Sequence, residues 1–517
     1  MPVSFRDYTG REITRVYSDQ YGNYNALVPS TYTTSIPMPS GMSPNMMLAC
    51  MNDPGPIPGP GGTLIQDPHF KTQYTQFCYT FQYMPGATTY LDTPVEPIAA
   101  FAGQNQFPLD CEFKDGTPVI KSVKGSGYVG PYVAAPGGSF TIQALGQTQV
   151  PNPGYVVGLT LPTITRDYGF GAGGTVTLNG TALPAGSVTW GANTISVTLP
   201  GGVRAGRYQV MVRRNDTGFS SVMGVTLTVG PISGTVRSVQ PPNTIQAAID
   251  AAAPGDLILV GEGFYEELVV MWKPVLLQGA GAHGVTINAV KTPGEKLQAW
   301  RNKVADLFAT GAVDALPGQI IVPDPNGVEP GLLGTAEGPG IMVLAKSGFP
   351  PQGFGQIGVF SNARIDGLTI TGGDIGGGIY VNGYADYLFI TNNRIRNNAG
   401  INGGGITIGH PDLVAANGAP VDADNDNIVV RYNHITQNGS REGGAGGGVS
   451  IYTGANNYQV TACWVCGNFT KGVGGGIGHQ GLSNNGLIAQ HTIIYNQSFN
   501  QLPATRPAAA GLAIEGF

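Results

Sequence analysis

The sequence predicts an all-β protein whose main part is a right-handed parallel β-helix, and three features of residues 362–500 lead to this prediction. Runs of three glycines recur at 376–378, 403–405, 446–448 and 474–476. Aliphatic residues are followed three positions later by an asparagine at Asn398, Asn438, Asn468 and Asn496. Subtracting these numbers gives steps of 40, 30 and 28 residues. The pieces between are short β-type runs without an amphipathic helix. A stack of coils of roughly 28 residues with insertions explains all three features.

The glycines and asparagines have distinct expected roles in such a stack. We expect the glycines to supply the positive φ angles with which each coil turns into its next strand. We expect the asparagines to tolerate the left-handed region and to hydrogen-bond the equivalent residue one coil away. The sequence therefore predicts a buried ladder through Asn398, Asn438 and Asn468.

The composition of the chain limits the classes of protein and partner. With 80 Gly and 39 Pro among 517 residues and 11% charged residues, the chain is not a helical protein, and 41% hydrophobic residues exclude wholesale disorder. A net charge of −6 without a basic cluster argues against nucleic acid as a partner. No apolar run reaches the length of a transmembrane helix. We expect a secreted or cell-surface protein of bacterial type whose leader lies outside this sequence.

Residues 1–35 carry the pattern of a small β-sandwich module. A D-x-x-G turn begins at Asp7, and a strand and a hairpin from Asp19 to Tyr24 follow it. The pattern resembles the prealbumin-like modules of the carboxypeptidase-regulatory and collagen-adhesin B-type families. Almost nothing precedes Asp7, so we expect a partial sandwich that is either truncated or completed by another chain.

Residues 36–150 are rich in Pro, Gly and Met and predict an irregular β module. The methionines nearest to Cys50 are Met38, Met42, Met46, Met47 and Met51. Thioether and thiolate ligands suit Cu(I), but methionines also fill irregular apolar gaps, and we prefer that interpretation to a copper site at 38–51. Two of the three cysteines Cys50, Cys78 and Cys111 are expected to form a disulfide, and the sequence does not choose the pair.

Residues 151–231 predict an antiparallel sandwich, because alternating strands are separated by turns such as Asn179-Gly180. The stretch G-x-Y-x-V-x-V at 206–212 is similar to a late strand of the immunoglobulin-like IPT/TIG fold. That resemblance implies a spacer domain without a catalytic site.

Residues 232–517 form the predicted β-helix. A short helix beginning near Asn243 or Thr244 would bury Ile245, Ala248 and Ile249 and stop at Pro254-Gly255. With the strands after it, this stretch resembles the start of pectate-lyase-like and pectin-esterase-like β-helices. Insertions at 291–355, with a helix over 295–308, and at 410–426 are expected to flank a lateral ligand groove.

The candidate site residues fall into two sets. Asp422, Asp424 and Asp426 place three carboxylates on alternate positions, which suits calcium, although a solvated acidic turn has the same pattern. The catalytic candidates are His410, His434, Arg441, Lys471 and His491. The motifs of polygalacturonases and pectin esterases are absent, so we expect each histidine to be a ladder or surface residue. Cys463 and Cys466 are expected to be small buried stacking residues rather than a redox pair.

The functional prediction that follows is a secreted or cell-surface, multi-modular protein with a structural, adhesive or carbohydrate-binding role. A polysaccharide lyase or hydrolase acting in the groove is one alternative, and a self-assembling extracellular matrix or filament protein is another. We favour a protein that is not an enzyme, with polysaccharides or cell-surface glycans as partners. Residues 508–517 resemble the start of another coil, so we expect a fragment of a longer chain or self-association through the chain ends.

Overall fold

The computed structural model describes the chain in two compact units, residues 1–109 with 290–303 and residues 110–289 with 304–517. Within these units the described residues are 1–7, 11–28, 47–71, 74–81, 88–91, 95, 109–155, 160–319, 337–348, 354, 363–411, 413–414, 418–440, 444–498 and 509–516. None of the helices in this described part has the length and apolarity needed to span a bilayer.

The first unit is built on one antiparallel sheet with strand order β2-β1-β3-β6. Its strands are β1 (Pro2–Arg6), β2 (Glu12–Tyr17), β3 (Met47–Met51) and β6 (Phe77–Phe81), and a small hairpin pairs β4 (Ile57–Pro58) with β5 (Leu64–Ile65) around the short 3-10 helix η1 (Pro60–Gly62). Because β1 pairs with both β2 and β3, the boundary that we predicted after residue 35 falls inside a single sheet. Ladder hydrogen bonds join the two predicted modules into one.

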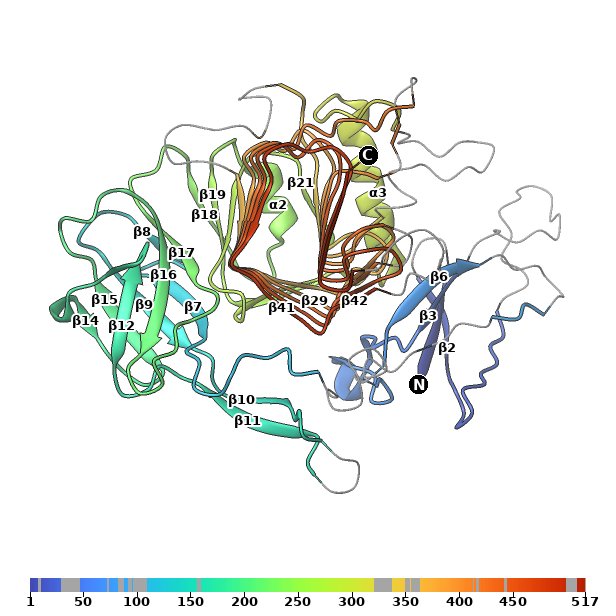
Figure 1. Ribbon diagram of the computed structural model, residues 1–517, viewed down its shortest axis with the longest axis horizontal. Helices are drawn as coiled ribbons and strands as arrows, with labels where there is room; N and C mark the ends of the chain where they lie inside the picture. The colour runs from blue at the N-terminus through green and yellow to red at the C-terminus, as the bar shows by residue number, and fades with distance from the viewer. Residues whose placement is uncertain are drawn as a thin grey trace. The chain divides into compact units, whose positions relative to one another are not determined.

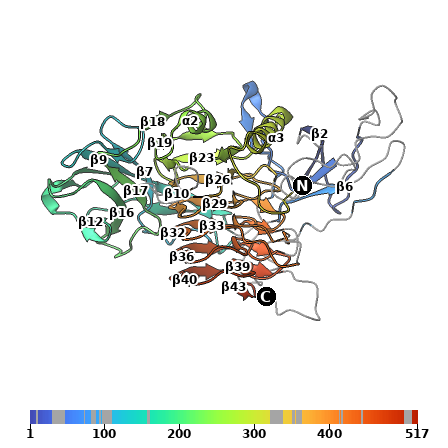
Figure 2. The same ribbon diagram turned by 90° about the horizontal axis from the view of Figure 1, so that it is seen from above.

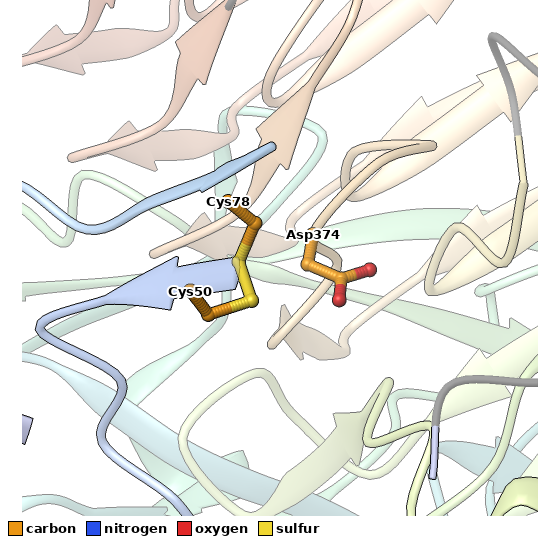
Figure 3. A group of neighbouring side chains, drawn as sticks. All are labelled: Cys50, Cys78 and Asp374. Atoms are coloured by element: carbon orange, nitrogen blue, oxygen red, sulfur yellow. A yellow bond between two sulfur atoms is a disulfide. The ribbon is translucent and has the colours of Figure 1, made fainter. Parts of the chain in front are cut away.

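A disulfide and an apolar core hold this sheet together. Cys50 of β3 lies opposite Cys78 of β6, and the two form a disulfide (Figure 3). Met47 and Met51 are buried beside Phe5, which agrees with methionines that fill a core. The disulfide uses the Cys50 sulfur that the copper alternative required, while Met38, Met42 and Met46 lie outside the described residues.

The second unit contains a two-sheet β-sandwich. One sheet has the order β14-β15-β9-β7 and the other β13-β12-β16-β17-β8. The strands are β7 (Ile120–Gly125), β8 (Tyr132–Val133), β9 (Ser139–Ala144), β12 (Gly174–Leu178), β13 (Thr181–Ala182), β14 (Val188–Thr189), β15 (Thr194–Thr198), β16 (Gly206–Arg214) and β17 (Val225–Val229). The 3-10 helix η2 (Ala185–Ser187) precedes β14, and β10 (Gly146–Pro151) and β11 (Thr163–Tyr168) form a separate hairpin.

The predicted start of this sandwich at residue 151 is wrong. Strand β9 pairs with β15, and Ile120, Val123 and Phe140 belong to the same apolar core as Val176 and Val210. The sandwich therefore includes residues that we had assigned to the irregular module. The turns between β7 and β9 are rich in Gly and Pro, and this hid the alternation of apolar residues in the strands themselves.

The rest of the second unit is a parallel β-helix, in which coils stack in layers (Figures 1 and 2). The first sheet contains β18 (Val236–Val239), β19 (Leu257–Val260), β22 (Leu276–Gly279), β25 (Arg364–Asp366), β28 (Phe389–Thr391), β32 (Val429–Arg431), β36 (Gln459–Thr461) and β40 (Leu487–Ala489). The second sheet contains β20 (Gly263–Tyr265), β23 (Val285–Asn288), β26 (Thr369–Thr371), β29 (Arg394–Arg396), β33 (His434–Thr436), β37 (Trp464–Cys466) and β41 (Thr492–Ile494).

Two further sheets close each coil. The third sheet contains β21 (Val269–Met271), β24 (Ile341–Val343), β27 (Ile379–Val381), β31 (Ile406–Ile408), β35 (Val449–Ile451), β39 (Ile477–Gln480) and β43 (Leu512–Glu515). The fourth contains β30 (Ala399–Gly400), β34 (Gly439–Ser440), β38 (Phe469–Thr470) and β42 (Gln497–Ser498). Strand β43 pairs with β39, so residues 512–515 begin a coil as predicted.

Aliphatic side chains fill the lumen of the stack. The middle residues of successive strands in the second sheet, Ile370, Ile395, Ile435 and Val465, are fully buried in one core. Each such side chain contributes about 2 kcal/mol on burial. The neighbours on either side of each middle residue point outward, because side chains alternate along a strand. In the second sheet, the first and third residues of each three-residue strand therefore face away from the lumen, toward solvent or the sandwich.

Both predicted helices are present. Helix α2 (Ile245–Ala251) has Thr244 as its N-cap, whose hydroxyl accepts from the N–H of Ala247, and it buries Ile245 and Ile249 against the first coil. Helix α3 (Gly294–Ala309) lies in the first insertion, with Trp300 buried. The helix α2 thus covers apolar surface where the stack begins.

The triple glycines serve mainly to allow close approach of backbones. Only Gly377, Gly446 and Gly474 of these runs have positive φ angles. A Cβ atom on Gly447 would lie 2.1 Å from the carbonyl oxygen of Phe469, so a side chain has no space there. Our expectation that φ alone explains the glycines was therefore incomplete.

Candidate functional site

The predicted asparagine ladder is confirmed. The side chain of Asn398 donates from Nδ2 to Oδ1 of Asn438 at 2.9 Å, and the same bond joins Asn438 to Asn468 and Asn468 to Asn496. Each Nδ2 also donates to a carbonyl of the preceding coil, as Asn438 does to Ile395 at 2.9 Å. All of these side chains are buried. The residue in the left-handed region is the one before each asparagine, such as Gln437 with φ 58°, and not the asparagine itself.

A second ladder explains one catalytic candidate and one cysteine. The backbone N–H of Asn393 donates to Oδ1 of Asn433, and the Asn433 Nδ2 lies 3.9 Å from the Cys463 sulfur. In the next coil, Nδ1 of His491 accepts from the Cys463 N–H at 3.1 Å, while Nε2 donates to the Val460 carbonyl at 2.9 Å. Both ring nitrogens of His491 are thus used in the ladder. Cys463 is the buried stacking residue that we predicted.

His434 is also occupied structurally. Its Nε2 donates to the carbonyl of Cys111 at 3.0 Å, and the ring of Phe113 lies 4.5 Å away between centroids. Burial, opposed by the charge of Glu112, lowers the pKa of His434 to about 4, so the imidazole is neutral at pH 7. Its side chain is fully buried, and it cannot reach a polymeric substrate.

The segment over His434 is fastened by a disulfide between Cys111 and Cys466. This corrects the expectation that Cys466 is only a small stacking residue. The expected disulfide among Cys50, Cys78 and Cys111 is the one between Cys50 and Cys78, and Cys111 has its partner in the β-helix. The two cysteines are 355 residues apart, and spacing along the sequence gives no sign of such a pair.

The remaining catalytic candidates lie in other environments. His410 is buried after β31, Lys471 is exposed after β38, and Arg441 lies outside the described residues. The further histidine His479 is buried in β39, where Nδ1 lies 2.9 Å from the hydroxyl of the core residue Tyr458. The described candidates therefore do not share one sheet or one surface.

A corner of the stack before the first sheet presents polar side chains in columns. The column Asp386, Asp426, Asn456, Asn484 is linked coil to coil, because each side-chain Oδ1 accepts the backbone N–H of the next member at 2.7 to 2.8 Å. Beside it, Nδ2 of Asn485 donates to Oδ1 of Asn457 at 3.3 Å. We call Asn456, Asn457, Asn484 and Asn485 the asparagine corner. Asn457, Asn484 and Asn485 are exposed.

The acidic part of this corner contains the predicted calcium ligands. Oδ1 of Asp422 accepts from the N–H of Asp424 at 2.9 Å, and Oδ1 of Asp426 is held in the column. Within the described chain, the three carboxylates do not form a group with oxygens within 4.8 Å of one another. Burial and the neighbouring carboxylates raise the pKa of Asp424, and burial with the same charges raises that of Asp386 to about 6. The loop thus holds mutually repelling carboxylates rather than a ready-made calcium site.

The asparagine corner was missed at the level of sequence, although a signal was present. The dipeptides Asn456-Asn457 and Asn484-Asn485 are separated by 28 residues, which equals the last ladder step. A repeated Asn-Asn pair in phase with the coils predicts a column of amides on one face.

The sandwich and the β-helix are joined by a buried polar junction. The carboxylate of Asp366, in β25, accepts from the Thr226 hydroxyl of the sandwich at 2.5 Å and from Gln278 Nε2 at 2.7 Å. Asn392 adds a bond from Nδ2 at 2.8 Å. Together with the Cys111–Cys466 disulfide, this junction fixes the two modules within one unit.

Comparison with known proteins agrees with the fold. A family model described as right handed beta helix region matches residues 344–497, which are 154 of the 517 residues. The chain therefore carries a right-handed parallel β-helix, as predicted. No curated protein and no solved structure matches the sequence.

Proposed function

We propose that this chain is a secreted or cell-surface protein whose β-helix binds carbohydrate at the asparagine corner and displays it on a rigid, multi-modular scaffold. The exposed columns of amides carry the proposal. Each side-chain amide offers two donors and an acceptor with two lone pairs. Hydrogen bonds between coils use only part of this capacity, as at Asn484 Nδ2, which donates to Asn456 Oδ1 at 3.1 Å. The remaining groups match the alternating donors and acceptors of sugar hydroxyls.

Preorganisation supports binding at this corner. Asn457 and Asn485 have φ angles of 57° and 56°, and both sit in turns held by the stack. Side chains that are already ordered lose less conformational entropy when a ligand binds. Within each column, successive amides are separated by the distance between neighbouring strands, about 4.8 Å. A glycan chain can therefore contact several equivalent amides.

A non-enzymatic role is supported by the use of the catalytic candidates. His491 uses both ring nitrogens in the ladder, and the fully buried His434 donates from Nε2 to the Cys111 carbonyl. Both histidines have lowered pKa values because burial disfavours the charged form. The disulfides Cys50–Cys78 and Cys111–Cys466 support an oxidising compartment, hence an extracellular location. A lyase or hydrolase remains the alternative outcome of the test.

The test compares binding to a panel of insoluble and soluble polysaccharides by the double variant Asn457→Gly/Asn485→Gly and the unaltered chain. Glycine accepts the left-handed backbone at both positions, so the substitution removes only the amides. We expect binding to weaken at least tenfold. The control Gln298→Ala/Asn302→Ala removes another exposed amide pair, joined at 2.8 Å in α3, and should bind normally.

The same panel separates binding from catalysis. Release of reducing ends or of unsaturated uronates, with and without EDTA, would establish an enzyme and displace the proposal. Equal binding by both double variants and the unaltered chain would remove the asparagine corner as the site.

A second candidate role, self-assembly, is favoured by apolar side chains on the last described coil. Leu482, Leu487, Leu512 and Ile514 are exposed there. A second copy stacked on the strand edges of this coil would cover them. Light scattering at micromolar concentration tests this role, and a monomer at all concentrations would exclude it.

Calcium binding by Asp422, Asp424 and Asp426 is a separate proposal. The repulsion among these carboxylates, seen in the raised pKa of Asp424, would be relieved by a divalent cation after the loop rearranges.

A further inference from the structure

The outward face of the second sheet carries two adjacent arginines. Ile395 of β29 points into the lumen, so Arg394 and Arg396 on either side of it point outward. In the neighbouring strands, Thr371 and Thr436 flank Arg396 at the same register. Arg396 therefore lies between two threonine positions on the outward face of the second sheet.

The charges in this cluster do not balance. Nη2 of Arg394 pairs with Glu112 Oε1 at 3.3 Å. The side chain of Arg396 makes no ion pair or hydrogen bond with any residue that the structure describes, and the Nε atoms of both arginines are buried without a partner. The charge of Arg394, followed by burial, lowers the pKa of Arg396 to about 10. Two guanidinium groups therefore share one carboxylate.

A neighbouring histidine adds an uncharged polar group. Nε2 of His283 is buried and has no hydrogen-bond partner among the described residues. Burial and the charges of Arg394 and Arg396 hold the pKa of His283 well below its usual range, so the ring is neutral. The cluster consequently has an excess of donors and a net positive charge around the two arginines.

We infer that Arg394 and Arg396 bind an oxyanion, a carboxylate or sulfate group such as an acidic polysaccharide carries. A guanidinium that is withdrawn from water without a counterion is costly, and an anion between the two side chains removes that cost. The planar fork of arginine also matches the geometry of carboxylate and sulfate oxygens. This site lies on the second sheet and is independent of the asparagine corner, which recognises neutral hydroxyls.

The test is calorimetric titration of the full chain at low ionic strength with sodium sulfate, with trigalacturonate and with neutral maltotriose. We expect saturable binding of one or both anions at this site. Arg396→Gln should weaken anion binding at least tenfold, because it removes the charge and keeps much of the side-chain length. Arg431→Gln is the matched control, since Arg431 is exposed on the first sheet over the Tyr432 ring, and it should bind as the unaltered chain does.

Glu112→Gln provides a readout that a purely structural role would not produce. This substitution removes the carboxylate that competes with the ligand, so anion binding should tighten severalfold while Arg396→Gln weakens it. Arg396→Lys, which keeps the charge, should retain part of the affinity and serves if the glutamine variant does not fold. Binding of sulfate alone would assign the site to a free anion, and tighter binding of trigalacturonate to an acidic glycan.

Two results would overturn the inference. One is the absence of saturable binding of either anion at low salt. The other is a change in the same direction in Glu112→Gln and Arg396→Gln, which would indicate only a structural contribution. Loss of binding to neutral polysaccharides in the asparagine-corner variants, with anion binding intact, would separate the two sites.

Discussion

Replacing Asn438 by Ala should destabilise the β-helix more than any exposed substitution of the same type. The Asn438 side chain makes four hydrogen bonds in the lumen wall. Its Oδ1 accepts from N and Nδ2 of Asn398 at 3.2 and 2.9 Å. Its Nδ2 donates to the Ile395 carbonyl and to Asn468 Oδ1, both at 2.9 Å. Alanine can make none of these bonds.

The size of the destabilisation follows from the buried polar groups that lose the Asn438 side chain as a hydrogen-bond partner. The backbone N–H of Asn398 and the carbonyl of Ile395 are both in the buried wall, where a polar group without a partner costs about 1–3 kcal/mol. Two such groups give a loss of about 4 kcal/mol in the free energy of unfolding, with partial relaxation included.

Urea unfolding followed by circular dichroism measures this loss, and unchanged m values would show that the same transition is compared. Asn484→Ala is the matched control, because the side-chain hydrogen bond from Asn484 to Asn456 is exposed. We expect its free energy of unfolding to change by no more than about 0.5 kcal/mol. Equal stability of Asn438→Ala and Asn484→Ala would refute the argument that the buried ladder holds the coils together.

Four other predictions test separate features. Asp386→Asn should raise stability above pH 6 and leave it unchanged below pH 3.8. The pKa of Asp386 is raised from 3.8 to about 6, so the ionised carboxylate destabilises the fold and the protonated carboxyl does not. Thermal melts across this pH range measure the difference. Ala462→Gly should stabilise the chain by about 0.5–1 kcal/mol in urea, since Ala462 has φ 52°. Replacing Cys111 and Cys466 by Ser should cost up to about 5 kcal/mol, seen as a lower melting temperature, whereas no change would mean that the junction alone holds the sandwich. EDTA added to calcium-saturated protein should lower the melting temperature if the acidic loop binds calcium, and an unchanged melt would remove that site.

The regular part of the fold was predictable from sequence because each coil repeats the same chemistry. Asn398, Asn438 and Asn468 recur in phase with buried aliphatic residues, and a ladder is the arrangement that satisfies buried amides in a stack. The sandwich boundary was not predictable in the same way. Strands β9 and β15 pair although about fifty residues separate them in the sequence. Such a pairing depends on tertiary contacts, and no local sequence pattern encodes it.

The functional surface was predictable only in part. The sequence correctly suggested that a histidine could be a ladder residue, and His491 is one. It could not show that residues 110–113 cover His434, because that contact joins positions 323 residues apart. The charge excess at Arg396 also depends on which distant carboxylate reaches the sheet. Glu112 forms its ion pair with Arg394, so the two guanidinium groups of Arg394 and Arg396 share this one carboxylate.

The direction of the asparagine ladder has a consequence for how the chain acquires its shape. Each ladder residue satisfies peptide groups of the coil before it, as Asn438 does for Asn398 and Ile395 and Asn468 does for Asn438. A turn is therefore finished only when the next coil arrives. A chain that is synthesised from its N-terminus presents its coils in this same order, so the order of synthesis matches the order in which the coils are completed. Helix α2 covers the apolar end of the first coil, so this coil has its apolar surface buried before the later coils are added.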